Sequence, residues 1–259
     1  MVVGLDRFRQ HFAGYQSNYT VIGGTAVFVA MDAAGLESRA TKDLDIVICV
    51  ETLDPEFVRR LWEFVEAGGY EARERSTGET ELYRFWKPTD KTYPYMLELF
   101  SRELDIIRVP DGCRLTPIPV ADEVSSLSAI LLNDDYYQLV QQGSRDENGV
   151  SVLDAAYLVP LKARAWLDLT DKRAAGADIS SRDIKKHRTD ILRLSQLMSP
   201  AMRISVPDSI HADLARFVDE GLFDGCAPGD IGAPGTLEDV RGLIESVYEP
   251  SGRSAELNS

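Results

Sequence analysis

Two acidic residues, Asp43 and Asp45, stand one residue apart in an apolar run that extends to Ile48. Side chains alternate along a strand, so both carboxylates point to one face, about 7 Å apart at Cα, while Leu44 and Ile46 point to the other. Ionised carboxylates on an apolar strand repel each other and lose hydration, which is tolerated mainly when a cation lies between them or the strand end is wet. Mg²⁺ suits this pattern because it binds carboxylates, substrate phosphates and water. Two such ions about 4 Å apart can activate an attacking oxygen and stabilise a leaving one.

A glycine pair, Gly23-Gly24, lies upstream of these acids between two predicted elements. The β-rich segment 18–22 predicts a strand, and Thr25–Met31 predicts the helix that follows. Glycine lets backbone N–H groups approach an anion closely, and a helix N-terminus carries a partial positive charge. Thr25 adds a hydroxyl donor. The turn is therefore a candidate phosphate site, although glycine pairs also occur in ordinary turns.

A third acid is expected from a neighbouring strand, and Glu98 in the segment Tyr95–Phe100 is the best candidate. Alternation places Leu97 and Leu99 on one face and Glu98 on the other, so its carboxylate can join Asp43 and Asp45 without disturbing the core. Three further acids compete for this role: Glu81, Glu103 and Asp105. The first two lie in polar, charged stretches where solvated acids are usual, whereas Asp105 stays open as an alternative.

The glycine pair with Thr25, the segment Thr41–Val47 and the later Glu98 together resemble the signature of the DNA polymerase beta-like nucleotidyltransferase superfamily. The resemblance implies that Asp43, Asp45 and Glu98 are both the metal ligands and the catalytic residues. It also implies a nucleoside triphosphate substrate and, as its cofactor, two Mg²⁺ ions. The residues expected to hold the triphosphate in this half of the chain are Gly23, Gly24, Thr25 and Lys42.

The second half of the chain resembles the AbiEii-type toxin branch of that superfamily, in the segments 152–153, 158–165 and 183–190. This resemblance implies that Lys162 contacts phosphate and that Lys186 and Asp190 face the nucleotide across a cleft. The sequence departs from the pattern at His187, where the family more often has an acid. The residues alone leave other readings open. Lys162 can extend its amine to solvent, and Lys186 with Asp190 has the i, i+4 spacing of a surface ion pair.

The length of 259 residues and the change in pattern near Pro117–Pro119 predict two domains. We expect a catalytic domain over 1–118, an α/β (α+β) mixed sheet with flanking helices, then a helical domain over 119–250 and a flexible tail over 251–259. Strands are predicted over 71–75, 82–86, 95–100 and 106–109, besides those at the glycines and the acid pair. Helices are predicted over 5–15, 54–67, 122–132, 134–142, 151–169, 180–198, 207–221 and 237–248.

The formal net charge of −14 opposes nucleic-acid binding unless positive charge is concentrated locally. Such a concentration occurs in the predicted helical domain, diluted by aspartates. Its members are Lys162, Arg164, Lys172, Arg173, Arg182, Lys185, Lys186, Arg188 and Arg193. RNA, such as tRNA, therefore remains an open acceptor, although a solvated helix face is the usual meaning of such a run.

The three cysteines form no CxxC pair and are odd in number, which favours neither a zinc site nor a disulfide framework. The N-terminus lacks a signal-peptide pattern. The sequence predicts a cytoplasmic protein with no membrane segment. The expected activity is metal-dependent transfer of a nucleoside monophosphate from a nucleoside triphosphate, such as ATP, to a hydroxyl, with release of pyrophosphate. The resemblance suggests the toxin of a toxin–antitoxin or phage-defence system, with a cognate antitoxin as partner. Two alternatives stay open: an aminoglycoside-type nucleotidyltransferase, and a catalytically degenerate nucleotide- or partner-binding protein.

Overall fold

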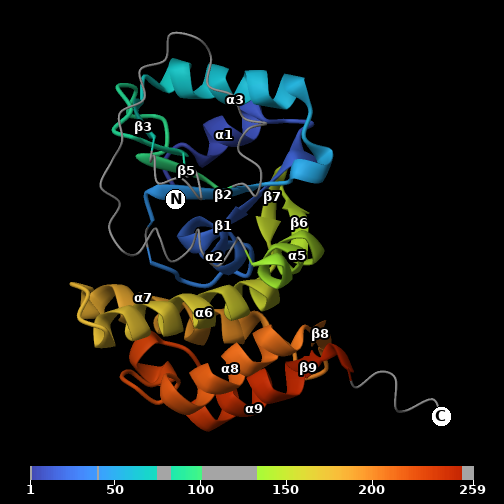
Figure 1. Cartoon of the computed structure of the whole chain (residues 1–259), viewed down its shortest axis with the longest axis vertical. Helices are drawn as coiled ribbons and strands as arrows, with labels where there is room; N and C mark the ends of the chain where they lie inside the picture. Colours follow the sequence, from blue (N-terminus) through green and yellow to red (C-terminus); the bar gives the residue numbers. More distant parts are fainter. Residues whose placement is uncertain (1, 40, 75–82, 101–132, 253–259) are drawn as a thin grey trace, which may run out of the picture. The chain divides into compact units, whose positions relative to one another are not determined.

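The computed structural model describes residues 2–39, 41–74, 83–100 and 133–252 (Figure 1). The described residues form two compact units. The first contains those within Met1–Val120 together with Val140–Asp154, and the second contains those within Ala121–Leu139 and Ala155–Ser259. The predicted domain boundary near residue 118 lies outside the described residues, so it stays a prediction. The structure adds that Val140–Asp154, beyond this boundary, belongs to the first unit.

The first unit is built on a mixed sheet, in which the described residues supply seven strands in the order β3-β4-β5-β2-β1-β7-β6. Strand β5 runs parallel to β2 and β7 parallel to β1, whereas the other neighbours are antiparallel. The bounds are β1 Tyr19–Ile22, β2 Asp43–Ile48, β3 Glu71–Glu74, β4 Tyr83–Trp86, β5 Met96–Phe100, β6 Ser144–Glu147 and β7 Val150–Leu153. This sheet confirms the predicted mixed α/β class. The predicted strand at 106–109 lies outside the described residues.

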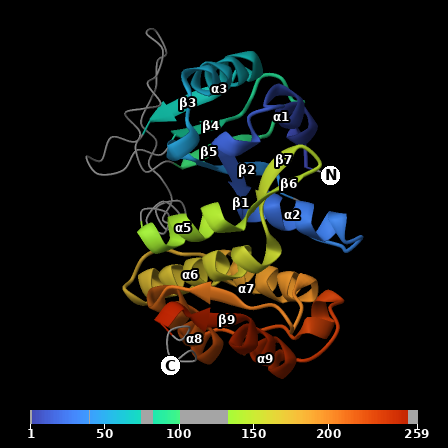
Figure 2. The same ribbon diagram turned by 90° about the vertical axis from the view of Figure 1, so that its right-hand side faces the viewer.

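Helices cover both faces of this sheet. Helices α1 (Leu5–His11) and α3 (Pro55–Gly68) lie on one side, and α2 (Gly23–Ala33) lies on the other (Figure 2). The short 3-10 turn η1 (Gln16–Asn18) precedes β1, and the 3-10 turn η2 (Val50–Thr52) follows β2.

Helix α3 confirms the helix predicted over 54–67 and shows why it begins and ends where it does. The Asp54 carboxylate accepts a hydrogen bond from the backbone N–H of Phe57 at 2.7 Å, and Pro55 occupies the first turn, where its missing donor costs nothing. Gly69 ends the helix with a φ of 59°, a conformation that glycine adopts without strain.

Aromatic rings fill the layer between the sheet and the helices α1 and α3. The ring of Phe8 packs against Phe12 at 4.5 Å and edge-on against Tyr19 of β1 at 5.1 Å, and Phe64 of α3 lies 5.7 Å from it. These rings are buried. Each ring removes a large apolar area from water, so this layer fixes the sheet face that is opposite to the acids.

The hairpin β6–β7 was not predicted, and a helix was predicted to begin at residue 151 where the structure has strand β7. The two strands are joined by Asn148 and Gly149, whose φ angles are 53° and 84°. Two residues with positive φ form the turn that matches the twist of a two-stranded hairpin, and Asn-Gly is its typical sequence. The Asn148-Gly149 dipeptide is the sequence feature that indicates this hairpin.

The second unit is mainly helical. It contains α6 Ala155–Ala174, α7 Ser181–Leu194, η4 Ser195–Leu197, β8 Ile204–Val206, α8 Asp208–Glu220, η5 Pro228–Ile231, α9 Leu237–Val247 and β9 Tyr248–Pro250, while α5 Asp134–Gly143 spans the division between the units. Strands β8 and β9 pair in parallel. Helix α6 packs on α7 and α8, with the Trp166 ring edge-on to Phe217 at 5.6 Å.

No helix in the described part of the chain has the length and apolar character needed to cross a membrane.

Candidate metal and nucleotide site

At the glycine turn the backbone lies close to the Asp45 carboxylate. Strand β1 ends at Ile22, whose Cα partner on β2 is Asp45, and α2 begins at the next residue, Gly23. Gly23 has a φ of 66°, and a Cβ added there would lie 1.9 Å from Oδ2 of Asp45. A side chain at this position would therefore occupy the place of the Asp45 carboxylate. At Gly24 an added Cβ would lie 3.1 Å from Oγ1 of Thr41.

Replacing Gly23 by alanine is expected to displace the Asp45 carboxylate and to lower the free energy of unfolding by about 2–4 kcal/mol. Gly35 provides a matched control, because its φ is 69° and an added Cβ would have no atom within 4 Å. Gly35→Ala should show the backbone strain alone, about 1 kcal/mol. Urea denaturation of the two variants measures the difference, and equal destabilisation would show that Asp45 does not need the space at Gly23.

Asp45 lies in register with Glu98. Asp45 on β2 is the Cα partner of Glu98 on β5, and Glu98 is in turn the partner of Arg84 on β4. Nε of Arg84 donates a hydrogen bond to Oε1 of Glu98 at 2.5 Å. Glu98 is 5% exposed, so its carboxyl group is almost completely removed from water. The prediction that Glu98 would join Asp45 on one face agrees with this register.

The electrostatic environment of Glu98 is that of two carboxyl groups sharing one place. Burial, followed by the neighbouring Asp45 carboxylate, raises the pKa of Glu98 to about 8, against the opposing effect of Arg84. Burial disfavours the charged form, and a like charge nearby disfavours it further. The Glu98 carboxyl group therefore ionises less readily than an exposed glutamate.

Asp43, the remaining predicted ligand, begins β2 and lies two residues before Asp45 on the same face. Its side chain is partly exposed, whereas Leu44 and Ile46 are buried. Its backbone carbonyl accepts a hydrogen bond from Oγ1 of Thr25 at 2.6 Å. Thr25 is fully buried, so this hydroxyl ties the start of α2 to β2. Lys42, the other residue predicted to hold nucleotide on this side, is exposed.

These residues fit a divalent cation by their chemistry. Asp43, Asp45 and Glu98 supply the hard oxygen donors that Mg²⁺ prefers, and the missing side chain of Gly23 leaves the space that the Asp45 carboxylate occupies. Among the described residues, no three His, Cys, Asp or Glu side chains are grouped tightly enough to hold a metal ion as they stand. A cation would therefore have to draw these carboxylates together.

The nucleotide-binding residues predicted in the second half of the chain all belong to the second unit. Nζ of Lys162 forms an ion pair with Oδ2 of Asp190 at 2.9 Å, and their side chains are 6% and 0% exposed. Arg193 adds a longer contact to Asp190 at 3.6 Å. Lys186 lies 3.7 Å from the Asp183 carboxylate on the same helix. In this structure Lys162 and Asp190 thus form an internal pair across α6 and α7.

Burial also changes the expected positive patch for RNA. Arg188 is 2% exposed and donates hydrogen bonds to the backbone carbonyls of Gly221, Leu222 and Cys226. A buried guanidinium that donates to backbone carbonyls inside the protein does not contact RNA at the surface. Lys162 and Arg188 are therefore removed from the set of exposed basic residues in this region.

Arg84 was not identified from the sequence, although a signal was present. It interrupts the aromatic segment Tyr83–Trp86, at the alternate position expected to share a face with Glu98 on a neighbouring strand. An arginine between aromatic residues in a strand needs a carboxylate partner when it is buried. The pairing could not be read from the sequence because the register between β4 and β5 was not known.

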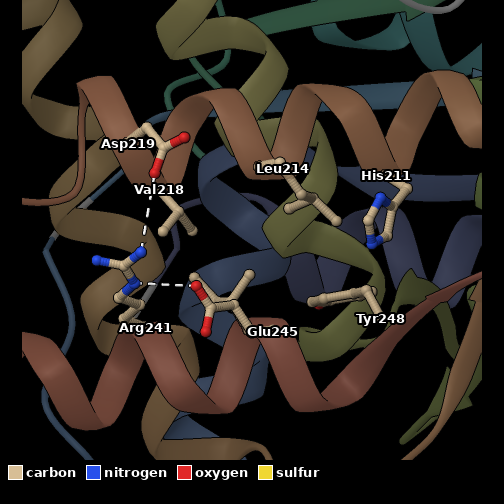
Figure 3. A pocket seen from close by; sticks show the side chains of 9 residues that line it. His211, Leu214, Val218, Asp219, Arg241, Glu245 and Tyr248 are labelled. Atoms are coloured by element: carbon tan, nitrogen blue, oxygen red, sulfur yellow. Dashed lines mark hydrogen bonds and ion pairs between the residues drawn. The ribbon is translucent and has the colours of Figure 1, made fainter.

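A pocket of about 290 Å³ lies elsewhere, between α8 and α9 in the second unit (Figure 3). Leu214, Val218 and Ile244 give it an apolar side. At its edge Arg241 pairs with Glu245 at 2.9 Å and reaches Asp219 at 3.9 Å. None of the predicted site residues lines this pocket.

Comparison with known proteins gives distant structural similarity alone. No protein-family model and no curated protein matches the chain. Among solved structures, it is similar to an antigenic nucleotidyltransferase-like protein from Paracoccidioides brasiliensis, with a TM-score of 0.46 and 15% identity over 97% of this chain and 98% of that one. It is also similar to a cytoplasmic RNA terminal U-transferase, with a TM-score of 0.30 and 11% identity over 86% of this chain and 66% of that one. Similarity at this level assigns neither a family nor an activity.

Proposed function

We propose that this protein is a metal-dependent nucleotidyltransferase, which transfers a nucleoside monophosphate from a nucleoside triphosphate to a hydroxyl and releases pyrophosphate. The observation that supports this most is the alignment of Asp45 with Glu98 on adjacent strands, beside a turn where only glycine leaves space for the carboxylate. Asp43 shares the strand and the face of Asp45. Carboxylates from two strands beside a backbone turn and a helix N-terminus combine sites for a cation and for a phosphate.

In this proposal Asp43, Asp45 and Glu98 hold Mg²⁺, and the backbone N–H groups at Gly23 and Gly24 face the triphosphate. Bound Mg²⁺ would neutralise the charge that develops on the phosphoryl oxygens. The protein residues contribute by position. Thr25 fixes α2 against the carbonyl of Asp43, so the N-terminus of the helix is held beside the acids. Glu98, buried and in register with Asp45, is the group proposed to accept the proton of the attacking hydroxyl.

The acceptor and the biological setting are further parts of the proposal. The resemblance of 158–165 and 183–190 to AbiEii-type toxins favours RNA, such as tRNA, as acceptor and a cognate antitoxin as partner. Lys42, Lys162, Lys186 and Asp190 are the remaining residues proposed to contact nucleotide. For Lys162 this role requires that the amine leave Asp190, or that both together form part of the binding surface.

The direct test is incubation of the full chain with each labelled nucleoside triphosphate, Mg²⁺ and total tRNA. A parallel reaction replaces the tRNA by an aminoglycoside. Label incorporated into tRNA supports the RNA acceptor, and label on the aminoglycoside supports the small-molecule alternative. Transfer that continues in excess EDTA, or that survives both Asp43→Asn and Asp45→Asn, would exclude the proposed mechanism.

Two observations favour a second function, a degenerate family member that binds nucleotide or a partner protein without catalysis. Glu98 is engaged by Arg84, and the described acids are not grouped as a ready metal site. Equilibrium binding separates the two proposals. A degenerate binder would retain nucleotide in the presence of EDTA and would transfer no label to any acceptor, whereas an enzyme needs the cation for transfer.

A further inference from the structure

Three charged residues form a row across three adjacent strands of the first unit. Arg84 on β4, Glu98 on β5 and Asp45 on β2 are successive Cα partners. The side chains of Arg84 and Glu98 are 13% and 6% exposed, and Nε of Arg84 lies 2.5 Å from Oε1 of Glu98. A guanidinium so placed lies against one carboxylate of the candidate site.

We propose that Arg84 is the built-in counter-ion of this site: it pairs with Glu98 while no divalent cation is bound, and its positive charge opposes the binding of one. This inference rests on the proposed function, because it takes Asp43, Asp45 and Glu98 as the ligands of Mg²⁺. Arginine and a divalent cation oppose each other at the same buried carboxylate, since bringing two cationic groups together in a poorly solvated place is unfavourable. The ion pair therefore lowers the affinity of the site for the free cation.

Two other roles for Arg84 predict different effects of its removal. If Arg84 only held strands β4 and β5 together, its loss would lower stability and leave the affinity for the cation unchanged. If it positioned Glu98 as a ligand, its loss would weaken binding of the cation. The counter-ion role alone predicts tighter binding after the positive charge is removed.

The experiment titrates the native chain, Arg84→Gln and Arg84→Lys with Mg²⁺ and with Mn²⁺, without nucleotide, in an isothermal titration calorimeter. Glutamine keeps an amide that can donate a hydrogen bond to Glu98 but removes the charge. We expect Arg84→Gln to bind either cation about tenfold more tightly than the native chain. Arg84→Lys keeps the charge without the planar fork, so its affinity should lie between the two, at least about twofold above native. Unchanged or weaker binding by the glutamine variant would overturn the inference.

The aspartate variants, the absence of binding and the Arg84→Lys variant decide between the proposed function and the counter-ion role. Asp43→Asn and Asp45→Asn are titrated alongside, and loss of binding in both, together with an Arg84→Gln affinity equal to native, would retain the proposed function and reject the counter-ion. Absence of binding in the native chain and in Arg84→Gln would reject both. If Arg84→Gln does not fold, Arg84→Lys decides by the same criterion, with thermal unfolding as the check that the variant is native.

Discussion

The Asp45→Asn variant is expected to transfer labelled nucleotide at least about a thousandfold more slowly than the native chain. The substitution keeps the size of the side chain and its place beside Gly23, but removes the charge that would hold the cation. Its thermal unfolding should occur at the same or a higher temperature, because the like charge beside the buried Glu98 is removed. Loss of activity with unchanged or greater stability distinguishes a missing ligand from a damaged fold.

Asp219→Asn is the matched control for this substitution. Its carboxylate is 72% exposed and makes a 3.9 Å contact with Arg241, and it belongs to the second unit. Transfer by this variant should remain within about twofold of native, because exposed ion pairs contribute little. An Asp45→Asn variant that keeps a tenth or more of the native rate would contradict the role of Asp45 as a ligand, whatever its stability.

The second large effect is expected at the ion pair inside the helical unit. Asp190→Ala should lower the free energy of unfolding by about 3–5 kcal/mol, because it leaves the Lys162 ammonium buried without its carboxylate partner. Urea denaturation followed by far-UV circular dichroism measures this. Asp171→Ala removes the carboxylate of an exposed pair with Arg216 and is expected to change stability by about 1 kcal/mol or less. Similar values for the two variants would show that the buried pair is not structurally important.

A double substitution at the same pair separates its structural role from the proposed phosphate contact of Lys162. Lys162→Met with Asp190→Leu replaces both charges by apolar groups of similar size, which is often neutral or stabilising, so the chain should fold. If Lys162 contacts phosphate, the folded double variant should bind nucleoside triphosphate about tenfold more weakly. Native affinity in the double variant would mean that Lys162 is a structural residue alone.

Local pattern was enough to place the acids on strands. Alternation of apolar and acidic residues predicted β2 and β5, and both are confirmed over Asp43–Ile48 and Met96–Phe100. The helix α3 was predicted to within a residue at each end because its cap, its first-turn proline and its apolar face all agree. These features depend on residues close together in the chain, which is why sequence alone reveals them.

Long-range pairing was beyond the sequence. The partnership of Arg84 with Glu98 depends on the register between two strands, and a shift by one residue would have turned Arg84 to the other face. The pairing of Lys162 with Asp190 depends on how α6 packs on α7. The resemblance to the toxin branch implied a phosphate contact for Lys162 and a cleft position for Asp190. Residue types and spacing do not tell whether a charge meets an internal partner or a ligand.

The sequence by itself therefore determined the donors of the candidate site, the strand and helix that carry them, and the glycine turn between. The tertiary structure alone decided that Asp45 and Glu98 become neighbours, that Glu98 meets Arg84 and that Asp190 meets Lys162. The physical reason is that a carboxylate's preference for a cation is local chemistry, whereas the identity of that cation depends on strand register, helix packing and removal of water.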